Sequence, residues 1–309
     1  MSTQIEEPFF DDSYFQEHLP KLHHEILRQF QRILFSFFLF NVSFLALLSV
    51  EVILFFSLLP FLMHSTFLAF SLSGTFLTVF SYFILHLYFQ AKKPEQFEHL
   101  KKQFLSSCRH ETQNHLSIAA ALSALAAQVD EEKWIPSLGY HRIISFLFAR
   151  SARQDLFRFK QRLLRAALKE QIDQVRVAPT DLEAHVSLAN GYLAFSKLHG
   201  KAHEEQFREA ARLAIEEFQI LNDYAPNDPW IHEQLAKGYR DLSMPQEELM
   251  EMQLLVKLRP QDSDLLHRLG TLYFEQGCNA KGLRVYEELK QINYKKAEDL
   301  ISSYGSRDL

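Results

Sequence analysis

PWIHEQLAKGYRDLSMPQEELMEMQLLVKLRP, residues 229–260, is followed by SDLLHRLGTLYFEQGCNAKGLRVYEELKQINY, residues 263–294, and the two stretches share one pattern of residue types. The pattern recurs at a spacing of 34 residues, and that period is typical of two-helix units that stack on copies of themselves. Its apolar positions are three and four residues apart, so they share one face of a helix. In the first helix of each unit these positions are Leu235, Ala236 and Tyr239, and then Leu269, Gly270 and Tyr273.

Each unit also contains a turn and a closing residue. Pro is tolerated in the first turn of a helix, because its missing N–H would have no partner there, so Ser243-Met244-Pro245 predicts the start of a second helix. Pro260 closes the first unit, and Tyr294 occupies the equivalent position of the second. Residues 295–304 then predict a capping helix.

A third copy of the pattern lies upstream, within residues 182–226. About 13 extra residues lie between its Tyr192 and its second helix, around the polar stretch 197–207. They predict longer helices or a projecting loop, because such repeats tolerate insertions on one face. The residues predicted to pack within and between the units are Leu188, Ala189, Tyr192, Ala214, Phe218, Pro226, Leu235, Ala236, Tyr239, Pro260, Leu269, Gly270, Tyr273 and Tyr286.

These residues resemble the tetratricopeptide repeat (TPR) family, whose small residue after leucine, turn-facing aromatic residue and closing proline they reproduce over residues 182–294. The resemblance implies an α-solenoid, in a bacterial protein, whose first helices line a groove for protein or peptide partners. The small-residue site of the second helix holds Ala214, but Glu248 and Gly282 replace alanine in the next two units. That replacement predicts looser or less regular packing at these two sites.

A second strong pattern is the apolar segment 33–89, which contains no Lys, Arg or Asp, has Glu51 as its one acidic residue, and holds half of the chain's 28 phenylalanines. As one helix it would be about 85 Å long at 1.5 Å per residue, whereas the hydrocarbon core of a bilayer is about 30 Å thick. We therefore predict a hairpin of two membrane spans, at about 37–58 and 67–89. Glu51 then lies toward the turn, where it reaches the interface or pairs with the other helix. A hairpin buried in a soluble core is the alternative.

The charges beside this segment predict its orientation, because Lys and Arg near the ends of spans stay on the cytoplasmic side. Cations lie on both sides, so both termini are expected in the cytoplasm, and the protein is expected to be an integral membrane protein. Tyr82, Tyr88 and the adjacent Lys92-Lys93 predict an interfacial anchor. The flanking cations are Lys21, Arg28 and Arg32 before the hairpin, and Lys92, Lys93, Lys101 and Lys102 after it.

The phenylalanine-rich, two-lobed shape of this segment also resembles the chlamydial inclusion-membrane proteins. This resemblance implies insertion into a host-vacuole membrane after secretion, with both termini facing the host cytosol.

We expect four regions: a polar N-terminal tail at 1–32, the hairpin at 33–89, a helical region at 90–178, and the repeat array with its cap at 179–304. The helical region keeps the helical period but loses the repeat register, which predicts a degenerate repeat that shields the end of the array. The alternative rests on the many arginines of its last helix, because a basic amphipathic helix can lie on anionic lipid headgroups. The candidate lipid contacts are Arg158, Arg162 and Arg165.

Composition narrows the class of protein. Gly and Pro number only 9 and 10, and no alternating strand pattern bounded by turns occurs, so an all-α fold is expected. The net charge of −5 gives no indication of nucleic-acid binding. Cys108 and Cys278 are isolated, which suits a reducing compartment.

Motifs for chemistry were not found. His110-Glu111 and His115 fail the zinc-protease spacing by one residue, and no phosphate-binding glycine loop or nucleophile elbow is present. We therefore expect no enzyme, no metal and no cofactor.

The predicted partner groove lies on the first helices of the repeats. It combines polar residues with aromatic ones, and aromatic residues often dominate interface energies. Trp230 has an alternative role, packing against the preceding long helix. The groove candidates are Asn190, Leu193, Trp230, Glu233, Lys237, Arg240, His267, Thr271 and Phe274.

The sequence thus predicts a two-span hairpin followed by an α-solenoid, acting as a membrane-anchored scaffold or adaptor for protein partners. The alternative function is membrane remodelling or tethering, with the hairpin and the basic helix acting on lipid and the repeats self-associating.

Overall fold

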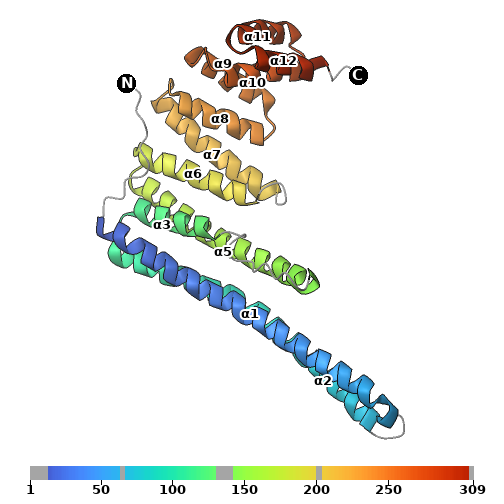
Figure 1. Cartoon of the computed structure of the whole chain (residues 1–309). Helices are drawn as coiled ribbons and strands as arrows, with labels where there is room; N and C mark the ends of the chain where they lie inside the picture. The colour runs from blue at the N-terminus through green and yellow to red at the C-terminus, as the bar shows by residue number, and fades with distance from the viewer. Residues whose placement is uncertain (1–12, 63–66, 130–141, 200–203, 306–309) are drawn as a thin grey trace. The chain divides into compact units, whose positions relative to one another are not determined.

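The computed structural model describes residues 13–62, 67–129, 142–199 and 204–305. Every secondary-structure element in these ranges is an α-helix, as the sequence predicts (Figure 1). The chain divides into two compact units, Met1–Ala167 and Leu168–Leu309, and the boundary falls within helix α5 (Arg142–Val177). The turn between the two predicted spans falls largely on residues 63–66, which lie outside the described residues.

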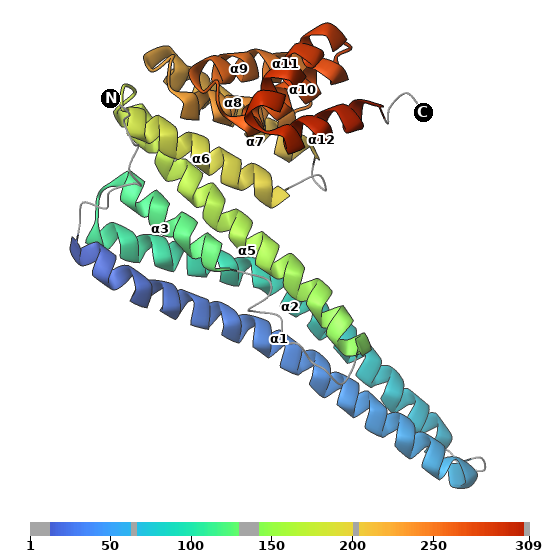
Figure 2. The ribbon, with the colours of Figure 1, turned by 45° about the horizontal axis from the view of Figure 1, so that its top comes forward.

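Two long helices form most of the first unit. Helix α1 (Ser13–Leu62) has 50 residues, and helix α2 (Phe67–Glu111) has 45. The two helices lie side by side, as Figures 1 and 2 both show. Helix α3 (His115–Gln128) packs on α2 and begins after Asn114, whose side chain accepts a hydrogen bond from the Leu116 N–H.

The region predicted as a polar tail is largely helical. Its residues 13–32 belong to α1 and bury Phe15, Leu19, Ile26 and Phe30. These residues recur at helical spacing, so this part of α1 has a core-facing side.

Phenylalanine rings from three helices form the core of the first unit. Phe159 on α5 stacks on Phe30 of α1 with ring centroids 4.4 Å apart, and it contacts Phe97 of α2 at 5.7 Å. Helix α2 also continues through Pro94, beyond the region boundary predicted at residue 89. The middle of α5 packs on α1 and α2 through Phe159.

The second unit is a series of helix pairs. In chain order the helices are α6 (Leu182–His199), α7 (Glu204–Tyr224), α8 (Pro229–Asp241), α9 (Pro245–Leu258), α10 (Ser263–Glu275), α11 (Asn279–Ile292) and α12 (Tyr294–Gly305). Each of these helices packs on the next, and α12 also packs on α10. Helices α6 and α7 have 18 and 21 residues, against 13 and 14 in α8 and α9, so the extra residues of the upstream unit lengthen both helices.

Caps and turns repeat with the sequence period. Asp228 and Asp262 cap α8 and α10, each accepting a backbone N–H bond of 2.9 Å from the residue two positions on. Ser243 and Gly277 occupy the equivalent turn positions with φ of 58° and 72°. This left-handed conformation is free for glycine but costs a serine energy.

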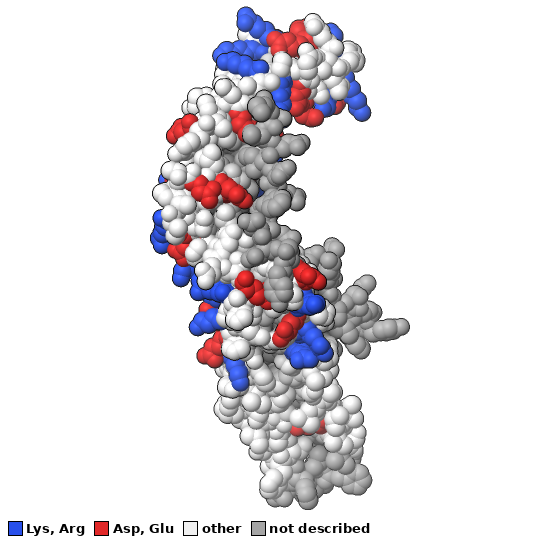
Figure 3. Space-filling model, turned by 90° about the vertical axis from the view of Figure 1, so that its left-hand side faces the viewer, with Lys and Arg blue, Asp and Glu red and all other residues white. Residues whose placement is uncertain are grey.

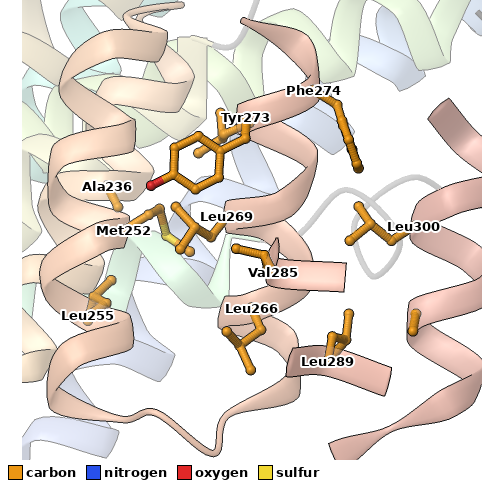
Figure 4. Packing of buried hydrophobic residues seen from close by; sticks show 12 residues of the cluster. Ala236, Met252, Leu255, Leu266, Leu269, Tyr273, Phe274, Val285, Leu289 and Leu300 are labelled. Carbon is orange, nitrogen blue, oxygen red and sulfur yellow. The ribbon is translucent and has the colours of Figure 1, made fainter. Parts of the chain in front are cut away.

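The core of the last units contains the leucines and the small residues that the pattern predicts (Figure 4). A Cβ on Gly270 would lie 2.6 Å from Leu300 of the capping helix, so this position must stay small. A Cβ on Gly282 would lie 2.5 Å from the ring of Phe274, which in turn stacks on Tyr304 at 4.4 Å. The Phe274 ring occupies the space that an alanine methyl group would take at position 282, so the packing there is less regular than the repeat pattern but not looser.

Candidate functional site

The candidate partner surface is the exposed side of α6, α8 and α10, here called the first-helix face. Asn190, Lys237 and Thr271 occupy equivalent positions in the three units and form one row along it. Asn190 and Lys237 are exposed, whereas Thr271 is half-buried and donates its hydroxyl to the His267 carbonyl oxygen at 2.9 Å. This row is therefore open to a partner mainly at its first two positions.

A second row consists of Leu193, Arg240 and Phe274. Only Arg240 is well exposed, at 45% of its side chain, while Leu193 packs against the hydrophobic core between α6, α7 and α8. Phe274 is 8% exposed and packs on α11 and α12. Phe274 is thus a core residue, and its predicted place as an aromatic contact of the groove is corrected.

The remaining groove candidates are half-buried. The Trp230 ring packs edge-to-face against the Phe218 ring of α7, with ring centroids 5.6 Å apart. This contact agrees with the alternative role for Trp230, packing against the preceding long helix. Glu233 forms an ion pair of 3.0 Å with Lys237 and lies 3.9 Å from Arg259. The first-helix face therefore carries both positive and negative side chains, and Lys237 and Arg240 are its exposed cations.

Buried histidines brace two of the units in the same way. His232 lies between the carboxylate of Glu251, 2.6 Å from Nδ1, and the Pro226 carbonyl oxygen, 2.9 Å from Nε2. His185 repeats this arrangement one unit upstream, with Glu217 at 2.6 Å and the Pro179 carbonyl at 3.0 Å. Both groups around the His185 ring are acceptors, so the charged imidazolium can donate to both of them.

The environment of His185 favours this charged form. Burial by itself lowers the pKa of His185, but the hydrogen bonds to Glu217 and to the Pro179 carbonyl outweigh it and raise the pKa above 6.5. In the last unit Leu266 and Val285 occupy the equivalent positions, and both are buried. His185 and His232 occupy the same position in successive repeats. This recurrence is visible in the sequence, but the prediction considered only the apolar positions of the repeat.

Hydrogen bonds between successive units also repeat. Gln219 donates to the Tyr239 hydroxyl oxygen at 3.0 Å, and Gln253 donates to the Tyr273 hydroxyl oxygen at 3.1 Å. Each bond joins the second helix of one unit to the first helix of the next. The tyrosines predicted as packing residues therefore also fix the spacing between units.

Glu248 joins three helices behind the first-helix face. Its carboxylate, 2% exposed, accepts a 2.7 Å bond from Arg240 of α8 and two 2.8 Å bonds from Arg268 of α10. Burial alone would raise the pKa of Glu248, but the bonds from Arg268 and Arg240 hold it below its ordinary value. The site predicted to pack loosely or irregularly is thus bridged by an ion network, and Arg240 is partly held by this network.

The other candidate surface is the outside of the α1–α2 hairpin. Between Phe37 and Lys93, none of the residues whose burial is described is buried, and Phe56, Phe70 and Phe76 are 66%, 74% and 72% exposed. Figure 3 shows this end of the first unit as a nearly uncharged surface. By length and composition both helices could cross a membrane.

Polar contacts join the two helices inside the hairpin. Thr78 donates to the Glu51 carboxylate at 2.7 Å, and Tyr82 donates to the Asn41 side-chain oxygen at 2.9 Å. The prediction that Glu51 can pair with the other helix agrees with this contact. Tyr82, by contrast, faces α1, and Lys93 is buried in an ion pair with Asp155. Of the four residues predicted to form an interfacial anchor, Tyr88 and Lys92 are therefore the exposed ones.

The three candidate lipid contacts on α5 differ in their surroundings. Arg162 donates to the Pro94 carbonyl oxygen at 2.7 Å and to Glu98 at 3.3 Å, so it holds α5 to α2. Arg158 and Arg165 are exposed. A lipid contact through Arg162 is therefore corrected to a structural role.

No family model matches the chain, and no curated protein matches it. Solved structures similar to the chain include that of TTC0263, a thermophilic TPR protein of Thermus thermophilus. It is 15% identical with a TM-score of 0.33, and the match covers 61% of this chain and 97% of that chain.

Structures of MamA AMB-1 and MamA MSR-1 are also similar, with 13% and 11% identity and TM-scores of 0.32 and 0.34. These matches cover 65% and 66% of this chain and 99% and 98% of those chains. TM-scores of this size do not establish a common fold. The helix-pair repeat is instead defined by the caps, turns and contacts that recur every 34 residues within this chain, as from Asp228 to Asp262.

Proposed function

We propose that this protein is a membrane-anchored scaffold, in which the α1–α2 hairpin spans the bilayer and the repeats bind a protein or peptide partner. The hairpin holds the repeats at the membrane, so a partner that binds the repeats is concentrated at the membrane surface. No chemical step is part of this function.

The uncovered apolar surface of the hairpin carries this proposal. Residues 38–62 of α1 extend beyond the packed part of the first unit for about 37 Å at 1.5 Å per residue, enough to cross a hydrocarbon core of about 30 Å. Contiguous apolar surface of this extent is unfavourable in water and indicates an interaction site. The polar contacts Thr78–Glu51 and Tyr82–Asn41 also support insertion, because they pair polar side chains with each other between the helices.

Charge beside the hairpin supports a cytoplasmic position for both termini. Arg32 before the hairpin and Lys92 after it are both exposed, and cations close to the ends of spans favour the cytoplasmic side. In a host-vacuole membrane, which the likeness to inclusion-membrane proteins implies, the same topology would place the repeats in the host cytosol.

The first-helix face is the proposed partner site. Its exposed polar groups, Asn190, Lys237 and Arg240, lie on units whose spacing is fixed by buried contacts. A preorganised surface loses little freedom on binding, which favours affinity. An extended segment with acidic side chains suits the two cations.

The test is a crosslinking pull-down with the full-length protein in its own membranes, read by mass spectrometry. The variant Asn190→Arg with Lys237→Glu alters the first-helix face, and Lys257→Glu is the matched control on α9, because Lys257 is exposed on the second helix of its pair. We expect specific proteins to be lost from the first variant and kept in the control. If only the protein itself is recovered, equally in both variants, the partner-binding role is refuted.

A further inference from the structure

Charged residues follow a regular order where the apolar hairpin meets the packed part of the first unit. Leaving the hairpin along α1, the first charged residue is Arg32, and leaving it along α2, the first is Lys92. The acidic residues Glu25 and Glu95 come only after these cations. Both helices therefore present a positive charge first at the end of their apolar surface.

An exposed aromatic ring lies one helical turn from each of these cations, on the hairpin side. Phe35 is 58% exposed and three residues from Arg32, and Tyr88 is 55% exposed and four residues from Lys92. The Lys92 ammonium is 5.5 Å from the centroid of the Tyr88 ring and donates to its hydroxyl oxygen at 3.4 Å. Aromatic rings beside cations are typical of the boundary between hydrocarbon and headgroups.

Helix α5 adds a third cation at the same boundary. Lys93 forms a buried 2.5 Å ion pair with Asp155 of α5, and its ammonium lies 3.5 Å from the centroid of the Phe37 ring. These contacts fix α5 at the level of Lys93. Arg158, one turn further along α5, is exposed and close enough to Lys93 to act on its charge.

The protein leaves these cations largely without anionic partners. Neither Arg32 nor Arg158 forms an ion pair with a residue in the described parts of the chain, and Lys92 contacts only the neutral Tyr88 there. The nearby carboxylates of Asp155 and Glu98 are already paired with Lys93, Lys101 and Arg162. We call Arg32, Lys92 and Arg158 the basic collar.

We propose that the basic collar binds the phosphate groups of anionic lipids at the membrane surface, so that the protein prefers anionic bilayers. This inference rests on the proposed insertion of the hairpin, which places the collar at the depth of the headgroups. Attraction of a cation near an anionic membrane surface corresponds to about a five-fold gain in affinity per residue.

The test uses the full-length protein in two arms. First, the detergent-purified protein is reconstituted with phosphatidylcholine vesicles and floated on a density gradient. Second, the protein in mild detergent is mixed with equal amounts of phosphatidylglycerol and phosphatidylcholine, and the lipids that remain bound are counted by native mass spectrometry. The collar variant is Arg32→Gln with Lys92→Gln and Arg158→Gln. The matched control, Lys257→Gln with Lys290→Gln and Lys295→Gln, removes the same charge from exposed positions of the repeats.

We expect all three proteins to float. Bound phosphatidylglycerol should be enriched at least about five-fold over phosphatidylcholine in the unaltered protein and in the control, but not in the collar variant. The variant Arg32→Lys with Lys92→Arg and Arg158→Lys keeps the charges and should keep the enrichment. Equal binding of both lipids by the unaltered protein, or unchanged enrichment in the collar variant, would overturn the collar alone. Failure of the unaltered protein to float would overturn the membrane anchor and the collar with it.

Discussion

Replacing Glu248 with glutamine should loosen the repeats locally, because Glu248 joins α8, α9 and α10. The carboxylate accepts three hydrogen bonds from Arg240 and Arg268, at 2.7 to 2.8 Å. A glutamine keeps the size but has one acceptor oxygen, and its amide N–H groups would face the Arg268 guanidinium. The two-pronged bond from Arg268 is therefore lost.

The size of the effect follows from burial. Hydrogen bonds to charged groups contribute about 1.5–3 kcal/mol each, and removing one partner of a buried ion pair costs about 3–5 kcal/mol. The Arg240 and Arg268 side chains are 45% and 28% exposed, so water replaces part of what they lose. We therefore expect a loss of about 2 kcal/mol, which corresponds to about 30-fold faster local opening.

Hydrogen exchange with mass spectrometry on the full-length protein in detergent measures this opening. We expect the amides of α8, α9 and α10 to exchange faster in Glu248→Gln, with no change in α1–α2. Glu288→Gln, at an exposed position of α11, is the matched control and should leave exchange unaltered. Arg268→Gln should show a loss of similar size, and the double variant should lose less than the sum, by about 1 kcal/mol. Strictly additive losses, or exchange unchanged in Glu248→Gln, would refute the network.

Three further predictions concern other parts of the chain. The pKa of His185 is raised on folding, so the contribution of this residue to stability is complete below pH 6.5 and is lost as the pH rises through the folded pKa. The protection of the α6 and α7 amides from hydrogen exchange, corrected for intrinsic exchange, should therefore fall over that pH range. In the variant His185→Gln it should not. Ser243→Gly should stabilise the α8–α9 turn by about 0.5–1 kcal/mol, seen as slower exchange there, because glycine adopts positive φ without strain; faster exchange would contradict it. Phe159→Ala should destabilise the first unit by about 3–5 kcal/mol, because the Phe159 ring packs on Phe30 and Phe97; faster hydrogen exchange in α3 and α5 would show it. Phe76→Ala, on the exposed surface of the hairpin, should leave the exchange of α3 and α5 unchanged.

The repeats could be predicted from the sequence because their packing depends on residue type at fixed spacing. Leu235, Ala236 and Leu269 are buried, and Pro245 begins a second helix, as the pattern requires. These features are local, so a single period determines them. The hairpin was equally visible, because a long apolar run constrains helix length directly.

The errors came from contacts between residues distant in the sequence. Glu248 in a small-residue site predicted looser or less regular packing, and nothing in the sequence shows that Arg268 of the next unit bridges this site. Phe274 was expected on the first-helix face, but Gly282, eight residues later, makes room for its ring. The helical start of α1 was missed for another reason, because its charged residues obscured the spacing of Leu19, Ile26 and Phe30.

The central claim is that the hairpin anchors the repeats in a membrane. Extraction of membranes from expressing cells with alkaline sodium carbonate tests it most directly, with the full-length protein and with the variant Leu47→Arg and Phe76→Arg compared side by side. We predict that the full-length protein stays in the membrane pellet and that the variant moves to the supernatant, because a charge at the middle of a span costs about 2.5–3.5 kcal/mol. Recovery of the unaltered protein in the supernatant would contradict the account.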